Sequence, residues 1–201
     1  MSTRRLYRMH WAIAGLIALS LWHFGQGAYI HAKAKLAQYL IRSAWEKALA
    51  GQKEVRPWPW ADTWPVGRLL VPRLQVDVFV LAGASGRTMA FGPGHIYGTA
   101  VPGMPGNSVI SAHRDTHFEF LRRLRQGDKV IVQTAEGRMR TYVMTEGQVV
   151  DKRDLRALRP DGLTRLTLVT CYPFDALRPG GPLRYVVTAT EVVTAIESGA
   201  I

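Results

Sequence analysis

The sequence contains a single cysteine among its 201 residues. One cysteine excludes an internal disulfide, and it also excludes the paired thiolates of a structural zinc site. Cys171 is therefore either an inert buried thiol or a reactive one, and composition alone leaves both alternatives open.

Acidic residues are also scarce: there are 15 against 26 lysines and arginines, which gives a formal net charge of +11. The basic residues form no stripe and no nucleic-acid recognition motif is present, so we expect no nucleic-acid partner. Residues 1–54 carry eight basic and two acidic residues around an apolar segment. Cations in such positions commonly accompany a membrane segment, because they are attracted to anionic headgroups.

No residue from Trp11 to Ile30 carries a fixed charge. Twenty helical residues at about 1.5 Å each span roughly 30 Å, which is the thickness of a bilayer core. A cleaved signal peptide is the alternative, but Ala32-Lys33-Ala34 is a poor cleavage site because it contains a charge. We therefore predict an uncleaved single-pass membrane anchor over residues 1–31, with an orientation that the basic residues on its two sides do not decide.

Residues 31–50 lack proline and glycine, so we expect the helix to continue as an amphipathic segment lying on the membrane or on the following domain. The apolar positions at helical intervals are Leu36, Tyr39, Leu40, Ala44 and Leu49. A segment rich in proline and tryptophan follows over residues 55–65, and its prolines predict a stiff linker. Residues 32–65 are thus predicted to connect the anchor to a domain at 66–201.

Residues 66–201 contain short strand-like runs separated by turns rich in glycine, proline and aspartate, which predicts an antiparallel barrel or sandwich. The runs are Arg68–Val71, Val76–Leu81, Ser108–Ala112, Lys129–Gln133, Arg140–Val149, Arg165–Thr170 and Leu183–Thr190. One helical piece is predicted at Thr116–Glu119, where Thr and Glu three residues apart form a capping box, with Gly127 placed to end it.

Three of the predicted strands border residues that can carry chemistry. Cys171 directly follows one strand, and Arg184 opens another after the flexible segment Pro179-Gly180-Gly181-Pro182. His113 directly follows a third strand. Because a hairpin can bring the second strand beside the first, the three strand ends can converge on one rim of the domain.

The segment Thr167-Leu168-Val169-Thr170-Cys171 resembles the TLxTC signature of the sortases. Arg184 stands at the spacing usual in that family, and His113 matches its histidine in position between the early strands. The resemblance covers about residues 66–195 and is greatest to the Gram-negative sortase class (class GN). The chain departs from the family just before His113, where Ser111-Ala112 replaces the more familiar Gly-His lead-in. Three segments carry the resemblance to this class. The segments are Gly92–His95, His113–Phe118 and Thr170–Phe174.

The resemblance implies an eight-stranded β-barrel with short helices, preceded by the transmembrane helix. It further implies a cysteine transpeptidase that cleaves a C-terminal sorting signal of a target protein through a thioacyl-enzyme. The acyl group would pass to an amine acceptor in the cell envelope, and no cofactor is implied. The enzyme would lie in the cell membrane with its catalytic domain outside the cytoplasm, on the periplasmic side in a Gram-negative cell.

The resemblance assigns catalysis to His113, Cys171 and Arg184. An imidazolium and a guanidinium near a cysteine favour the nucleophilic thiolate. His113 would return a proton to the leaving amine and later activate the incoming one. Arg184 is suited to the oxyanion or to the substrate backbone, beside the backbone amide of Tyr172.

Three further residues are candidates for substrate binding: Thr170 and Tyr172, which flank the cysteine, and His95, which follows a Gly-Pro-Gly turn. A histidine packed within its loop is an equal alternative for His95. The long connections at residues 151–164 and 172–183 are expected to form the walls of the substrate groove.

The same residues bear on other functions. His113 and His117 have the spacing of a zinc-binding helix, but Arg114 occupies the position of the required glutamate, so no metal site is expected. His117 is better interpreted as a capping residue or as support for the site. A hydrolytic cysteine protease, in which water resolves the same intermediate, remains an alternative. A membrane-tethered binding barrel with an inert Cys171 is another.

Overall fold

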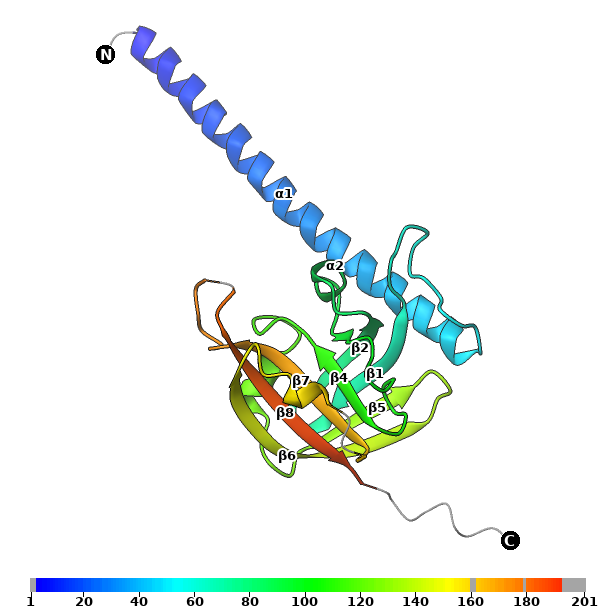
Figure 1. Ribbon diagram of the computed structural model, residues 1–201. Helices are drawn as coiled ribbons and strands as arrows, with labels where there is room; N and C mark the ends of the chain where they lie inside the picture. The colour runs from blue at the N-terminus through cyan, green and yellow to red at the C-terminus, as the bar shows by residue number, and fades with distance from the viewer. Residues whose placement is uncertain (1–2, 160–161, 179, 193–201) are drawn as a thin grey trace. The chain divides into compact units, whose positions relative to one another are not determined.

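The computed structural model describes residues 3–159, 162–178 and 180–192, and Figure 1 shows their elements. The chain divides into two compact units, residues 1–39 and 40–201. The predicted regions extend beyond this description: residues 1–2 of the anchor and residues 160–161, 179 and 193–201 of the barrel domain lie outside the described residues.

The first helix, α1, runs without interruption from Thr3 to Leu49. This confirms that the uncharged segment and the segment following it are helical. The part from His10 onward is the one helix among the described residues that is long and apolar enough to cross a membrane. It is a candidate membrane anchor on length and composition.

The last turns of α1 belong to the second unit and bury Ile41, Ala44, Trp45 and Ala48. These residues are spaced by three and four, as in a helix with one packed face. The Trp45 ring centroid lies 6.2 Å from that of Phe79 in the barrel.

The predicted apolar face of this segment was therefore wrong by about one position. Leu36, Tyr39 and Leu49 are exposed, Leu40 is half-buried, and only Ala44 of the five is buried. Two of the four buried positions are alanines, which hydropathy marks only weakly.

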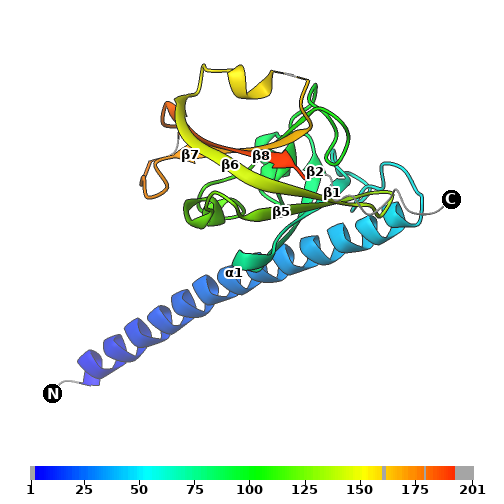
Figure 2. The same cartoon turned by 90° about the horizontal axis from the view of Figure 1, so that it is seen from below.

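Eight strands close into a barrel in the order β1-β2-β3-β4-β7-β8-β6-β5, and they curve around a common interior in Figures 1 and 2. The strands are β1 Pro65–Val71, β2 Val76–Ala82, β3 Gly94–His95, β4 Asn107–Ser111, β5 Lys129–Thr134, β6 Met139–Asp151, β7 Arg165–Tyr172 and β8 Leu183–Glu191. The seven predicted strands are confirmed with ends that differ by at most three residues. The eighth, β3, has only two residues and so cannot show an alternating pattern.

Short helices occupy several of the connections between strands. They are η1 Pro72–Leu74, α2 Gly86–Met89, η2 Glu119–Arg123 and η3 Arg156–Leu158. Helix α2 begins after Ser85, whose hydroxyl accepts a hydrogen bond from the Thr88 amide at 3.1 Å.

The expected capping box at Thr116 is wrong. Helix η2 begins after Phe118, no side chain caps it, and it ends at Arg123, before Gly127. The Glu119 carboxylate lies 3.6 Å from the Arg122 guanidinium instead of capping the turn. Burial of Phe118 in the core fixes where the helix begins, so packing overrides the local capping signal.

Most strand pairs are antiparallel, as expected, but β2 pairs with β3 and β4 pairs with β7 in parallel. The parallel pairing of β4 with β7 brings the C-terminal ends of these two strands to the same end of the barrel. Leu166 and Leu168 of β7 and Val187 and Ala189 of β8 point into the core. Each buried leucine contributes about 1.5–3 kcal/mol, which fixes the inward face of β7.

Candidate active site

Strands β4, β7 and β8 lie side by side and place the candidate residues in register. In the antiparallel pair β7–β8, Cys171 lies directly opposite Arg184. In the parallel pair β4–β7, Ser111 lies opposite Val169. The amide of Ala112 donates a hydrogen bond to the Val169 carbonyl at 3.3 Å, which extends this pairing beyond the end of β4.

The pairing brings His113 level with Cys171, because each lies two residues beyond the matched pair Ser111 and Val169. Neighbouring strands are about 4.8 Å apart. Cys171 on β7, Arg184 on β8 and His113, two residues past the end of β4, thus form a row at one end of the barrel. We call this set the catalytic row, after the role that the sequence predicts for it.

The members of the row share the outer face of the sheet. Side chains alternate along a strand, and Leu168 and Thr170 of β7 point inward, so Cys171 points outward. On β8, Tyr185 packs against the core, so Arg184 points outward as well. His113 is exposed, and Cys171 and Arg184 are half-buried, so all three side chains are within reach of a ligand.

Thr170 lies on the opposite, inward face and is only 1% exposed. Its hydroxyl donates a 2.7 Å hydrogen bond to the carbonyl of Ala112, the residue before His113. Thr170 therefore links the segment after β4 to β7. The sequence predicted that Thr170 contacts the substrate, but its side chain is buried in the core.

His95 is buried in β3, with 5% of its surface exposed. Its Nε2 lies 2.9 Å from the Ala100 carbonyl oxygen and 3.0 Å from the Thr99 hydroxyl. Burial penalises the imidazolium and lowers the pKa of His95. This environment matches the alternative of a histidine packed within its loop.

Tyr172, the third candidate for substrate binding, is half-buried beside the thiol-bearing residue. Its ring centroid lies 6.2 Å from that of Phe174 and 6.4 Å from that of Tyr185. Phe174 and Tyr185 pack against the core. The aromatic rings thus support the chain immediately after Cys171.

The Arg184 guanidinium is bound to the loop between β7 and β8. Its Nη1 donates to the carbonyls of Gly181 at 2.9 Å and Leu183 at 2.8 Å. Among the contacts described for Arg184, none uses Nε or Nη2. The guanidinium is therefore held in place through Nη1.

The model of the Sortase domain family matches residues 69–192, well over half of the chain. The chain belongs to the sortase family. It is 29% identical over 127 residues to Sortase D of Bacillus subtilis, which covers 63% of each chain. Sortase C-1 of Actinomyces oris has a similar structure, with a TM-score of 0.58 and 30% identity over 65% of this chain and 74% of that one. The chain thus spans less than two thirds of the length of Sortase D.

One residue beside the row of this sortase was missed from the sequence. Arg114 is only 9% exposed, and its Nη2 donates to the carbonyls of Ala176 at 2.7 Å and Arg178 at 3.1 Å. In the sequence it stood out only as the residue in place of a zinc-site glutamate. Its partners are backbone atoms more than 60 residues away, so no side-chain motif could have revealed them.

His117, which shares the turn with His113, is half-buried. Burial lowers the pKa of His117, and the nearby His113 lowers it further. Within the described part of the chain, no group of three or more His, Cys, Asp or Glu side chains could hold a metal ion.

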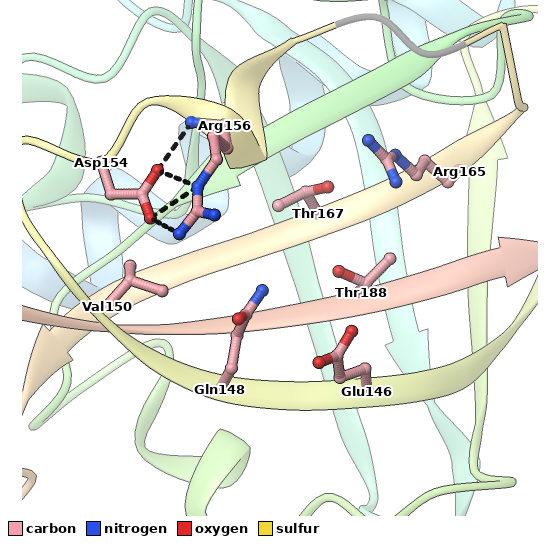
Figure 3. A pocket seen from close by; sticks show the side chains of 8 residues that line it. All are labelled: Glu146, Gln148, Val150, Asp154, Arg156, Arg165, Thr167 and Thr188. Carbon is pink, nitrogen blue, oxygen red and sulfur yellow. Dashed lines mark hydrogen bonds and ion pairs between the residues drawn. The ribbon is translucent and has the colours of Figure 1, made fainter.

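A pocket of about 240 Å³ lies on the same outer face of the barrel. Figure 3 shows Gln148 and Val150 of β6 and Thr188 of β8 along its wall, with Asp154 and Arg156 of the β6–β7 connection joined above them. The Arg156 Nε donates to the Asp154 carboxylate at 2.9 Å. Val150 pairs with Arg184, and Thr167 of β7 also lines the pocket, so the pocket extends over the two strands that carry Cys171 and Arg184.

Proposed function

We propose that this sortase is a membrane-anchored cysteine transpeptidase whose catalytic residues are His113, Cys171 and Arg184. The observation that carries the proposal is the row itself: a half-buried thiol lies between a histidine and an arginine on one outward face. The three residue types supply a nucleophile, an acid-base group and an anion-binding cation.

In the first step, the Cys171 thiolate attacks the carbonyl carbon of one peptide bond in the sorting signal. The C–N bond breaks, a thioester forms, and protonated His113 gives its proton to the departing amine. In the second step, neutral His113 takes a proton from the acceptor amine as the amine attacks the thioester. The new amide is released and the thiolate returns.

Arg184 acts where negative charge develops on the carbonyl oxygen. Hydrogen bonds to two loop carbonyls hold its Nη1, and Nε and Nη2 face no described partner. A fixed donor costs no reorganisation when the charge appears, so it stabilises the transition state more than the bound substrate. The backbone amide of Tyr172 is the second donor.

The substrate is proposed to lie along the outer face of β7 and β8, reaching the pocket beside Val150. A solved structure of Clostridium perfringens sortase C contains the C-terminal cell wall sorting motif, and the present fold matches it with a TM-score of 0.59 at 20% identity over 81% of this chain and 91% of that one. By analogy, the donor here is a target protein with a C-terminal sorting signal, and the acceptor is an amine of the cell envelope.

The proposal extends to class and location. The segments Gly92–His95, His113–Phe118 and Thr170–Phe174 favour the Gram-negative class. The apolar part of α1 would then anchor the enzyme in the membrane, with the barrel on the periplasmic side. Protease accessibility of the barrel in spheroplasts tests this location.

The test is incubation of the full chain in detergent with a library of proline-containing pentapeptides, with and without hydroxylamine as the amine. We expect a thioester adduct on Cys171 by mass spectrometry, and an acyl hydroxamate when hydroxylamine is present. Cys171→Ala should give neither. Cleavage to the free acid alone in the presence of hydroxylamine would identify a hydrolase, and the absence of any adduct would favour a binding barrel.

A further inference from the structure

Arg114 is a buried cation whose described partners are all backbone carbonyls. Within the described part of the chain, no carboxylate bonds to its guanidinium. Burying a charge is costly unless it is hydrogen-bonded, so the two carbonyl contacts are needed for this position to be stable. Hydrogen bonds from charged groups are stronger than neutral ones.

The two carbonyls belong to the loop that joins Cys171 to Arg184. Ala176 and Arg178 turn their carbonyl oxygens toward Arg114, while Leu177 between them is 100% exposed. Arg114 therefore fixes the path of the middle of the loop through its backbone, irrespective of the side chains there.

The end of the same loop is bound by Arg184, through the carbonyls of Gly181 and Leu183. Two arginines thus hold one loop. Arg114 adjoins His113 in the chain, and the other arginine is itself a member of the catalytic row. The loop is consequently a direct physical link between the segment that carries the histidine and the guanidinium opposite the thiol.

We propose that Arg114 is a positioning residue: by holding the β7–β8 loop, it fixes the positions of His113 and Arg184 relative to Cys171. This inference rests on the proposed transpeptidase function. A displacement of about 1 Å in a catalytic group can cost about 100-fold in rate. Loss of Arg114 should therefore affect turnover more than substrate affinity.

The experiment compares Arg114→Ala and Arg114→Lys with the wild-type full chain, using the pentapeptide that forms the thioester most rapidly. We expect turnover to fall by about 10- to 100-fold in Arg114→Ala, with KM changing less than threefold. Arg114→Lys should recover part of the loss, because an ammonium can still bond to one loop carbonyl. Thermal unfolding establishes that each variant is folded at the assay temperature.

Arg73→Ala is the matched control. Arg73 also donates to a backbone carbonyl, that of Arg123, at 2.6 Å, and it pairs with Asp128. None of its described contacts involves the catalytic row. Its loss should lower the melting temperature slightly while leaving turnover within about twofold of wild type, since surface ion pairs contribute little to stability.

A double-mutant cycle separates positioning from a general structural role. If Arg114 acts through Arg184, then adding Arg114→Ala to Arg184→Ala should cost much less than it does in the wild type. Full additivity, or near-normal turnover of Arg114→Ala, would overturn the inference. If Cys171→Ala is inactive in the same assay, the proposed function survives that outcome. Retained thioester formation in Cys171→Ala would instead overturn the proposed function itself.

Discussion

Thr170→Val tests whether the inward face of β7 supports the catalytic row. The substitution keeps the shape of the side chain but removes a buried hydroxyl that donates to the Ala112 carbonyl at 2.7 Å. An unsatisfied buried acceptor costs about 1–3 kcal/mol. For a unit of this size, each kcal/mol lowers the melting temperature by about 2–4 °C, so we expect a decrease of about 2–12 °C.

The same bond holds the residue before His113, so its loss should also reduce turnover. Release of the end of β4 lets the imidazole move relative to Cys171, and about 1 Å of movement can cost about 100-fold. KM should change little, because Thr170 is buried and its side chain cannot reach a bound peptide. A direct contact with substrate would give the opposite pattern, a raised KM with a normal melting temperature.

Thr63→Val is the control for this experiment. The Thr63 hydroxyl is also buried and also donates to a backbone carbonyl at 2.7 Å, that of Ala82, but it has no described contact with the catalytic row. Calorimetry should show similar destabilisation in both variants, and steady-state kinetics should show a turnover defect only in Thr170→Val. Equal defects in turnover, or none in either variant, would refute this assignment of Thr170.

Two further predictions concern Arg184 and His95. Arg184→Ala should lower turnover by about 100- to 1000-fold with a smaller change in KM. Arg184→Lys should recover only part of the loss, because lysine lacks the planar guanidinium fork. Near-normal steady-state kinetics for both variants would make Arg184 a structural strand residue. Burial lowers the pKa of His95, so below about pH 6.5 the unfolded chain binds a proton that the folded chain does not, and folding stability falls as the pH falls. Thermal unfolding between pH 5.5 and 7.5 should show a shallower dependence in His95→Asn, and an unchanged slope would contradict this account.

The strands could be predicted from the sequence because alternation of side chains is a local signal. β7 shows this clearly, since the positions of Leu166 and Leu168 already mark its inward face. The convergence of three strand ends could also be anticipated, because each strand stops at a turn. The parallel pairing of β4 with β7 could not, because it depends on which edge each strand meets after closure of the barrel.

The parts that were missed depend on contacts with backbone or on packing. The buried face of α1 includes Ala44 and Ala48, and hydropathy treats alanines as weak signals. Arg114 and Thr170 both act on carbonyl oxygens of distant segments. Every residue has a carbonyl, so such partners leave no trace in the identity of the side chains.

Cys171 and Arg184 lie thirteen residues apart in the chain, but the register of β7 against β8 matters for the site more than this number does. The two residues face each other because β7 and β8 pair at that point, and the loop between them can change length without altering the pairing. A slip of one residue in either strand, by contrast, would turn its entire outward set toward the core. Leu168 and Thr170 facing inward and Cys171 facing outward are therefore one constraint: the packing that buries the first two also presents the thiol between His113 and Arg184.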